Sequence, residues 1–213
     1  MKKIIVYGGT SLLSIEFIKK FDKEIDEFIV ISRNLNKNKE KIILFDEKLR
    51  KKIKFHQIDI LDLDQTLSFS NSITDNSLEG IFFVMGETGD PILEINDSEA
   101  CLKNYKTNLI HPVLIINSLI PKLKKNSFIC VFTSLAGLRG RAVRLFYCSA
   151  KAGLISYLSG LRQKLHQNDI NVINVIAGYM DTEKFNYKAN NLLISKPKDV
   201  INRVYNGIKS KKE

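Results

Sequence analysis

The chain has 213 residues, which is enough to bury one substantial hydrophobic core and requires no second domain. Hydrophobic residues make up 44% of the sequence and charged residues 26%, as in ordinary soluble globular proteins, and no apolar run approaches the roughly 20 residues of a membrane span. The formal net charge of +10 is spread over short groups of lysine and arginine without interleaved aromatic residues, which favours a solvated surface over a nucleic-acid-binding stripe.

The N-terminal segment, the cysteines and the histidines bear on compartment and metal content. The apolar run Ile4-Ile5-Val6 is too short for a signal peptide and soon meets Gly8-Gly9, so we expect a cytoplasmic protein. The three cysteines are scattered without a CxxC pair, and the three histidines lack metal-ligand spacing. This pattern predicts neither a disulfide framework nor a metal site.

Short β-branched or aromatic runs alternate with longer amphipathic stretches along the chain. The predicted strands cover residues 3–7, 28–32, 53–58, 81–85, 128–133 and 171–176. The predicted helices cover residues 11–21, 62–72, 97–119, 147–167 and 197–210, with Asp62 and Asp97 as suitable N-cap residues. Because several strands are apolar throughout, helices should cover both faces of the sheet, which predicts an α/β fold with a doubly wound parallel sheet.

A glycine turn joins the first predicted strand to the first predicted helix and reads Gly8-Gly9-Thr10-Ser11-Leu12-Leu13. Glycines at such a turn let the backbone bend tightly and approach a pyrophosphate, whose charge the amides at the helix start stabilise. A Gly-Gly turn after a strand is equally consistent with a structural turn, so both interpretations stay open for this motif alone.

The residues that follow the next three strands refine the cofactor prediction. Arg33 follows the second strand, where a cation favours the 2′-phosphate of NADP, although a surface arginine is the alternative. Asp59 and Ile60 follow the third strand, where an adenine edge can be contacted. Gly86 ends the fourth strand, where the backbone can lie close to a ribose. We therefore expect NADP(H) to be preferred over NAD(H).

Four further residues form a candidate catalytic group. Tyr147 and Lys151 lie four residues apart at the start of a predicted helix, so both project from one face, and an ammonium nearby favours ionisation of a tyrosine. Ser134 ends the fifth strand, where its hydroxyl can hold a substrate oxygen beside the tyrosine. Asn108 is a poor helix former in the middle of a predicted helix, which suggests that its amide has a function.

In their order and spacing these motifs resemble the short-chain dehydrogenase/reductase family, over residues 1 to about 182. The matching residues are Gly8-Gly9, Asp59, Gly86, Asn108, Ser134 and Tyr147-Cys148-Ser149-Ala150-Lys151. The resemblance implies one NAD(P)-binding Rossmann-fold domain over residues 1–213, which transfers a hydride between the nicotinamide and a small-molecule carbonyl or alcohol substrate.

The resemblance also implies a role for each residue of the site. Tyr147 is the general acid/base, Ser134 the ligand of the substrate oxygen, Lys151 the ribose anchor that modulates the tyrosine pKa, and Asn108 the holder of a water in a proton relay. Thr182 matches the position that contacts the nicotinamide carboxamide, and Gly178 precedes it in the cofactor-binding segment.

The sequence departs from the family pattern at several cofactor positions. Leu12 and Ser14 replace the second and third turn glycines, and Ala177 replaces the proline before Gly178. Phe83-Val84-Met85 stands where the family has Asn-Asn-Ala before Gly86. These departures bear on cofactor affinity rather than on the fold.

The C-terminal part bears on assembly and substrate. The family adds a strand and a tail after the helix that begins near Pro197, so we predict six strands here and a homodimer through the helices around Asn108 and Tyr147. Residues 180–196 are the predicted substrate-covering loop, whose aromatic and amide side chains suit a sugar or a precursor of cell-surface polysaccharide. The alternative function is a catalytically silent nucleotide-sensing or scaffolding protein on the same fold.

Overall fold

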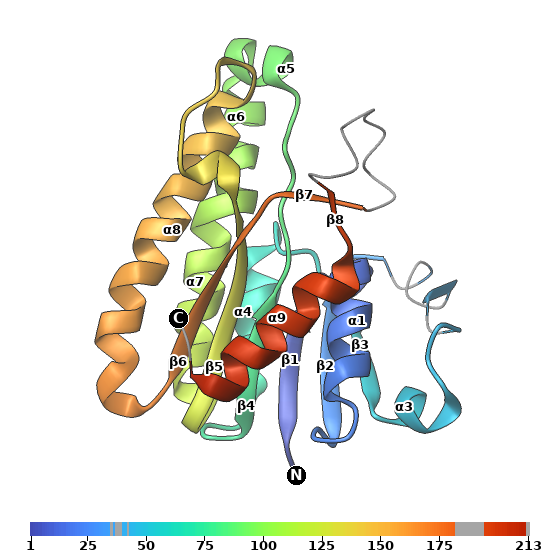
Figure 1. The fold of residues 1–213 in the computed structure, drawn as a ribbon. Coiled ribbons are helices and arrows are strands. Elements are labelled where there is room, and N and C mark those ends of the chain that lie inside the picture. The colour runs from blue at the N-terminus through green and yellow to red at the C-terminus, as the bar shows by residue number, and fades with distance from the viewer. Residues whose placement is uncertain (35, 37–39, 42, 182–193, 212–213) are drawn as a thin grey trace.

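A parallel sheet of six strands forms the centre of the molecule in the computed structural model, which describes residues 1–34, 36, 40–41, 43–181 and 194–211. The strand order is β3-β2-β1-β4-β5-β6 (Figure 1). The strands are β1 (Lys3–Tyr7), β2 (Glu27–Ser32), β3 (Ile53–Gln57), β4 (Leu78–Phe83), β5 (Leu123–Ser134) and β6 (Asn171–Ala177). A separate pair, β7 (Tyr179–Met180) and β8 (Ile194–Ser195), is also parallel. The predicted six-stranded parallel sheet is confirmed.

Helices cover both faces of the sheet, as the apolar strands predict (Figure 1). The α-helices are α1 (Leu12–Phe21), α3 (Glu47–Lys51), α4 (Leu63–Ser72), α5 (Pro91–Asn96), α6 (Ser98–Tyr105), α7 (His111–Leu119), α8 (Leu145–Leu165) and α9 (Pro197–Ser210). Short helical segments of other types are η1 (Lys106–Ile110), η2 (Ile120–Lys122), η3 (Leu135–Gly137), η4 (Ala142–Arg144) and η5 (His166–Asn168). None of the helices in the described ranges is long and apolar enough to cross a membrane.

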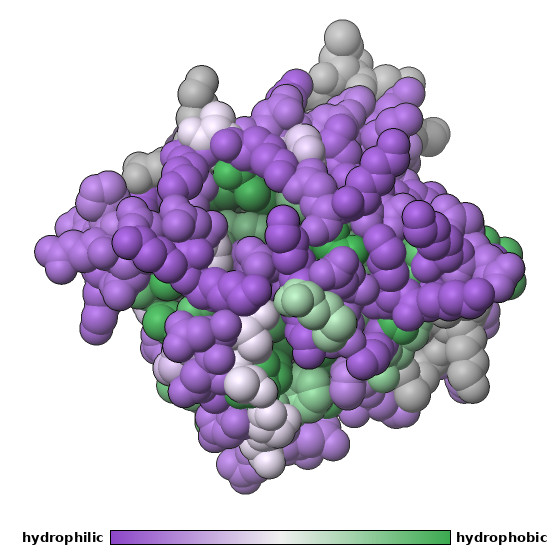
Figure 2. Space-filling model, turned by 90° about the horizontal axis from the view of Figure 1, so that it is seen from below, coloured by the Kyte–Doolittle hydropathy of each residue, from purple (hydrophilic) through white to green (hydrophobic). Residues whose placement is uncertain are grey.

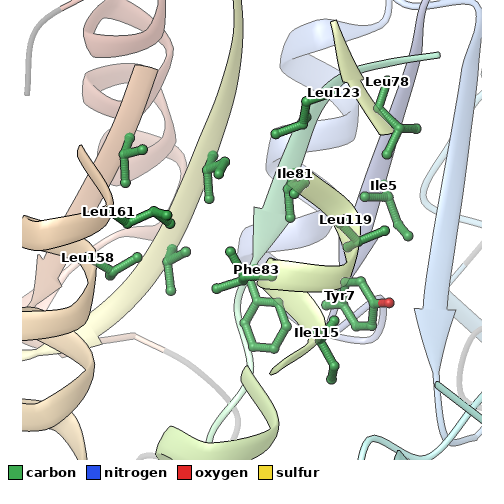
Figure 3. Close-up of a cluster of buried hydrophobic side chains, with 14 of the residues drawn as sticks. Ile5, Tyr7, Leu78, Ile81, Phe83, Ile115, Leu119, Leu123, Leu158 and Leu161 are labelled. Carbon is green, nitrogen blue, oxygen red and sulfur yellow. The ribbon is translucent and has the colours of Figure 1, made fainter. Parts of the chain in front are cut away.

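Alternate residues of the central strands belong to two separate hydrophobic cores. On β1, Ile5 and Tyr7 belong to the core formed with α7 and α8, as Figure 3 shows for Tyr7 beside Phe83 and Ile115. Ile4 and Val6 belong to the other core, which α1 and α9 close. Because each fully buried aliphatic or aromatic side chain contributes about 1.5–3 kcal/mol, these two cores stabilise the sheet from both sides.

The strand register brings the loops after the strands to one edge of the sheet. Tyr7, the last residue of β1, lies beside Ile31 of β2 and Phe83 of β4. Ser134, the last residue of β5, lies opposite Ala177 of β6. The strand order changes direction between β1 and β4, which is where open α/β sheets bind their ligands.

The fourth strand lies nearer the N-terminus than predicted. We expected residues 81–85, whereas β4 covers Leu78–Phe83, with Gly80 inside it. A side chain at Gly80 would lie 2.4 Å from the ring of Phe128 on β5, so the glycine makes room for that ring. Gly86 therefore lies three residues beyond the strand rather than at its end.

The long helix predicted over residues 97–119 is three helical segments in sequence: α6, the π-helical turn η1 and α7. Asn108 lies in the middle of this π-turn and is fully buried. Pro112 has no backbone N–H, so it cannot donate to the carbonyl oxygen of Asn108 four residues earlier. Single π-turns inside α-helices occur frequently at functional sites.

The basic groups of the sequence are largely paired or solvated. The run at the start of β5 pairs residue by residue: Lys122 with Asp75, Lys124 with Glu79, and Lys125 with Asp169. Viewed from below, where β1 begins, the surface is mostly hydrophilic, with hydrophobic residues visible in a few hollows (Figure 2). The charges of this run are therefore balanced by nearby carboxylates, while the solvated surface as a whole stays a prediction.

Candidate active site

Three of the predicted catalytic side chains meet at the carboxyl edge of the sheet. Tyr147 is the third residue of α8 and Lys151 lies one turn further along the same helix. The Nζ of Lys151 lies 5.7 Å from the centroid of the Tyr147 ring. Ser134 ends β5, and its side chain lies close enough to Tyr147 to lower the pKa of that phenol. The Ser134 Oγ also accepts a bond of 3.1 Å from the amide of Ala136, which fixes its rotamer.

Burial determines the protonation states of this group. Burial raises the pKa of Tyr147, and the hydrogen bond from Ser134 opposes that rise in part. Burial also lowers the pKa of Lys151 to about 8, since the side chain is only 2% exposed. The pKa of Tyr147 is thus raised, and the lowering expected from the ammonium is not among the causes of the shift. A raised pKa keeps the phenol protonated near neutral pH, which is the state that a proton donor needs.

Asn108 is bound to the segment after β4 through both polar atoms of its amide. Its Nδ2 donates to the carbonyl oxygen of Glu87 at 2.8 Å, and its Oδ1 accepts from the amide of Glu87 at 3.2 Å. The same Nδ2 also lies 2.9 Å from Oδ1 of Asn104. The side chain of Asn108 therefore holds this loop in place, and its role toward a relay water stays a prediction.

Gly86 lies between the catalytic helix and the π-turn. A Cβ at this position would lie 2.8 Å from Oδ1 of Asn108 and 3.0 Å from Nζ of Lys151. Lys151 Nζ donates a long hydrogen bond of 3.4 Å to the carbonyl oxygen of Met85. A side chain at this position would have to displace the ends of Asn108 and Lys151, so glycine lets the segment after β4 pass close to both residues.

The glycine turn after β1 has the shape expected of a phosphate-binding turn. Gly8 has a φ of +91°, and a Cβ there would lie 2.5 Å from the carbonyl oxygen of Val84. Ser11 caps α1 by accepting from the amide of Leu13. Because the first amides of a helix have no intrahelical acceptor, this end of α1 can bind an anion. The turn therefore fits the pyrophosphate of a dinucleotide.

The two departures from the family's turn glycines are accommodated in different ways. Ser14 is fully buried and its Oγ donates to the carbonyl oxygen of Gly8 at 2.8 Å, so its side chain supports the turn from within. Leu12 is the first residue of α1 and packs partly against the core closed by that helix. Thr10 precedes the cap and is partly exposed on the turn.

The predicted adenosine-binding residues lie beyond the ends of β2 and β3. Arg33 directly follows β2, and its guanidinium forms an ion pair of 3.0 Å with Glu87. The carboxylate of Asp59 accepts from the amide of Leu61. Nδ1 of His111 lies 2.6 Å from the carbonyl oxygen of Ile60, and because a carbonyl only accepts, Nδ1 carries the proton. The sequence did not identify Glu87 and His111 as partners of these residues, since neither belongs to a motif.

The nicotinamide end of the predicted site is only partly described. Gly178 follows β6, and a Cβ there would lie 3.3 Å from the side chain of Leu135. Thr182 and most of the predicted substrate loop, residues 182–193, lie outside the described residues.

The segment between Ser134 and Tyr147 and the nearby β7 carry exposed apolar residues: Leu135, Leu138, Val143, Leu145 and Tyr179. Two exposed arginines, Arg139 and Arg141, lie among them in the sequence. The segment that leads to the candidate site therefore combines apolar surface with positive charge.

Comparisons with known proteins show the family to which the chain belongs. The family model described as short chain dehydrogenase matches residues 2–192. A 3-oxoacyl-[acyl-carrier-protein] reductase FabG of Chlamydia trachomatis is 24% identical over 186 residues, which cover 85% of this chain and 75% of that protein. A ketoacyl reductase HetN of Nostoc sp. is 33% identical over 114 residues, only 50% of this chain and 40% of that protein.

Solved structures share the fold at low sequence identity. A structure of ElxO with NADP bound has a TM-score of 0.81 at 20% identity, covering 96% of this chain and 90% of that one. A short-chain dehydrogenase/reductase from Burkholderia multivorans with bound NADP has a TM-score of 0.80 at 15% identity, covering 99% and 92%. At these identities the likeness shows the fold alone.

Proposed function

Because this chain belongs to the short-chain dehydrogenase family and is an NAD(P)-dependent oxidoreductase, we propose that it reduces a carbonyl substrate with NADPH. The observation that carries the proposal is the meeting of Ser134, Tyr147 and Lys151 beside Gly86 at the carboxyl edge of the sheet. Reductase relatives and this group of side chains together disfavour the catalytically silent alternative.

The residues of the chain have complementary roles in this reaction. When bound, the reduced nicotinamide supplies a hydride to the carbonyl carbon. Ser134 holds the carbonyl oxygen, and Tyr147 donates the phenolic proton to that oxygen as the carbon–hydride bond forms, which gives the alcohol. Lys151 stabilises the resulting phenolate and holds the cofactor ribose, while Asn108 keeps the loop after β4 in register.

The preference for NADP(H) rests on Arg33. A guanidinium at the end of the second strand can bind the 2′-phosphate through two parallel N–H bonds, a geometry that lysine cannot reproduce. The bound NADP in several structures of similar fold supports the same choice. The other residues that would hold the dinucleotide are the glycine turn, Asp59, Ile60, Gly86 and Gly178, with Thr182 as a further prediction.

Two substrate classes remain to be separated. The sugar or polysaccharide precursor expected from the sequence depends on residues 180–196, most of which lie outside the described residues. The exposed leucines and arginines near Tyr147 favour a second candidate, a 3-oxoacyl thioester with an anionic carrier. The names of both curated relatives are consistent with that class.

We also propose that the protein is a homodimer. Leu102 of α6, Ile110 of η1 and Leu114 of α7 are 53%, 41% and 39% exposed along one helical run, and this surface belongs to the helices predicted to pair. A sedimentation mass of twice 24.3 kDa that falls to the monomer mass in Leu114→Glu is the expected result. A monomer at all concentrations would contradict it. The cytoplasmic location stays a prediction from the sequence.

Titration of the purified protein with NADPH and NADH, followed by nicotinamide fluorescence, tests the cofactor proposal. We expect tighter binding of NADPH, and loss of that preference in Arg33→Glu. Acetoacetyl-coenzyme A and a panel of keto-sugars then separate the substrate classes through NADPH oxidation. Binding of neither nucleotide would reject the proposal, and turnover of keto-sugars alone would reject the thioester.

A further inference from the structure

The ion pair between Arg33 and Glu87 lies across the proposed cofactor site. Arg33 follows β2 and Glu87 lies beyond the end of β4, while β1 and its glycine turn lie between these two strands in the sheet. The two side chains nevertheless approach to 3.0 Å between Nη2 and Oε1. The pair therefore joins the two sides of the position where an adenosine ribose has to lie beside the turn.

Glu87 is held in this place by its own backbone. Its amide donates to Oδ1 of Asn108 and its carbonyl oxygen accepts from Nδ2 of the same residue. Asn108 is fully buried in the π-turn. Its two hydrogen bonds therefore hold the backbone of Glu87 against the protein interior. The carboxylate is thus presented to Arg33 from a rigid support rather than from a loose loop.

The pair is weak enough to be exchanged. The side chains of Arg33 and Glu87 are 58% and 42% exposed, and exposed ion pairs stabilise proteins by only about 0.2–1 kcal/mol. A phosphate carries more charge than a carboxylate and binds a guanidinium through charge-assisted bonds, so it can displace Glu87 from Arg33. After displacement, the fixed backbone keeps the carboxylate within one side-chain length of Arg33, so its negative charge still repels the phosphate.

We propose that Glu87 is a cofactor-specificity residue that competes with the 2′-phosphate of NADP(H) for Arg33. This rests on the proposed cofactor site. Competition and repulsion both lower the affinity for NADP(H), whereas NAD(H) has no 2′-phosphate and is unaffected by either. The chain therefore discriminates between the two cofactors less sharply than Arg33 alone would allow.

Equilibrium binding of NADPH and NADH to the wild type and to Glu87→Gln tests the inference without any substrate. We expect NADPH to bind about 5–10-fold more tightly to the variant at low ionic strength, with the NADH affinity changed less than twofold. The gain should shrink as salt is added, because the charges involved are exposed. Thermal melting in parallel shows that the variant is folded.

Two further variants test whether the gain in affinity is specific to Glu87 and depends on Arg33. Glu99→Gln changes the net charge equally at an exposed position in the first turn of α6, and it should leave both affinities unchanged. In the Arg33→Gln background, the gain from Glu87→Gln should fall by half or more, because there is then no guanidinium to compete for. Equal NADPH affinities for wild type, Glu87→Gln and Glu99→Gln would overturn the inference while leaving the proposed function intact. Failure of the wild type to bind either nucleotide would reject both.

Discussion

The hydroxyl of Ser14 donates a 2.8 Å hydrogen bond to the carbonyl oxygen of Gly8 and so ties the first turn of α1 to the glycine turn before it. Ser14 is fully buried, and a glycine there would leave that carbonyl without this donor. The departure from the family's glycine pattern thus comes with a compensating contact. The turn keeps its shape because one residue both fills space and satisfies a backbone acceptor.

Gly8→Ala should damage the fold and the cofactor site together. Gly8 has a φ of +91°, and an added Cβ would lie 2.5 Å from the carbonyl oxygen of Val84. We expect the free energy of unfolding to fall by roughly 2 kcal/mol or more and NADPH affinity to fall at least tenfold. Chemical denaturation and fluorescence titration measure the two effects. The matched control is Gly140→Ala, where a Cβ meets no atom within 4 Å, and equal losses in both variants would contradict the prediction.

Tyr147→Phe should abolish turnover without abolishing cofactor binding. The substitution removes only the phenolic oxygen, so the helix and the nearby Lys151 keep their positions. General acid catalysis typically contributes about 10²–10⁴-fold, so we expect kcat to fall by at least about 100-fold at an unchanged dissociation constant for NADPH. Tyr205→Phe on α9 removes a hydroxyl bonded to Glu24 and should leave kcat unchanged. Undiminished turnover in Tyr147→Phe would assign the proton donor to another group.

The sequence was sufficient to predict the catalytic edge of the sheet because strand and helix periodicity fixes where side chains point. Ser134 ends β5 and Tyr147 lies in the first turn of α8, and both positions followed from local patterns. The strands of the sheet were predicted in number and direction for the same reason. The shift of β4 was not predictable, since it depends on the ring of Phe128 packing over Gly80 from another strand.

Contacts between distant segments could not be read from the chain. Glu87 and Arg33 are 54 residues apart, and His111 and Ile60 are 51 apart, so neither pair leaves a periodic signal. The sequence predicted a lowered pKa for Tyr147, whereas burial raises it. Desolvation depends on the whole packed environment rather than on the spacing to Lys151, so the shift could not be predicted from the sequence. The family resemblance supplied roles, but it contained nothing about Glu87.

The pH dependence of kcat/KM should reflect the loss of the proton from the Lys151 ammonium. Its pKa is lowered to about 8 by burial, so the ammonium is lost as the pH rises through that value, whereas Tyr147 keeps its proton because its pKa is raised above 10. Since kcat/KM reports the free enzyme, we expect it to fall about tenfold per pH unit above about pH 8 in the reductive direction. Lys151→Arg keeps its charge and should lack this decline, even if its activity is low. A profile that is flat to pH 10 in the wild type would contradict the assignment.

Lys151 should also lower the free energy of unfolding, because its charged side chain is buried. Its pKa falls from 10.5 to about 8 on folding, so between these values the unfolded chain binds more protons, and the free energy of unfolding of the wild type should rise with pH. Below about pH 8 the full penalty remains, on the order of 3 kcal/mol. Lys151→Met keeps the length of the side chain without the charge, so we expect it to unfold at higher denaturant concentration at pH 7 and to lack the rise between pH 8 and 10.5. Lys164→Met, at an exposed position of the same helix, should change neither quantity. A less stable Lys151→Met protein at pH 7 would mean that the contacts of the ammonium, including its bond to Met85, outweigh the desolvation of its charge.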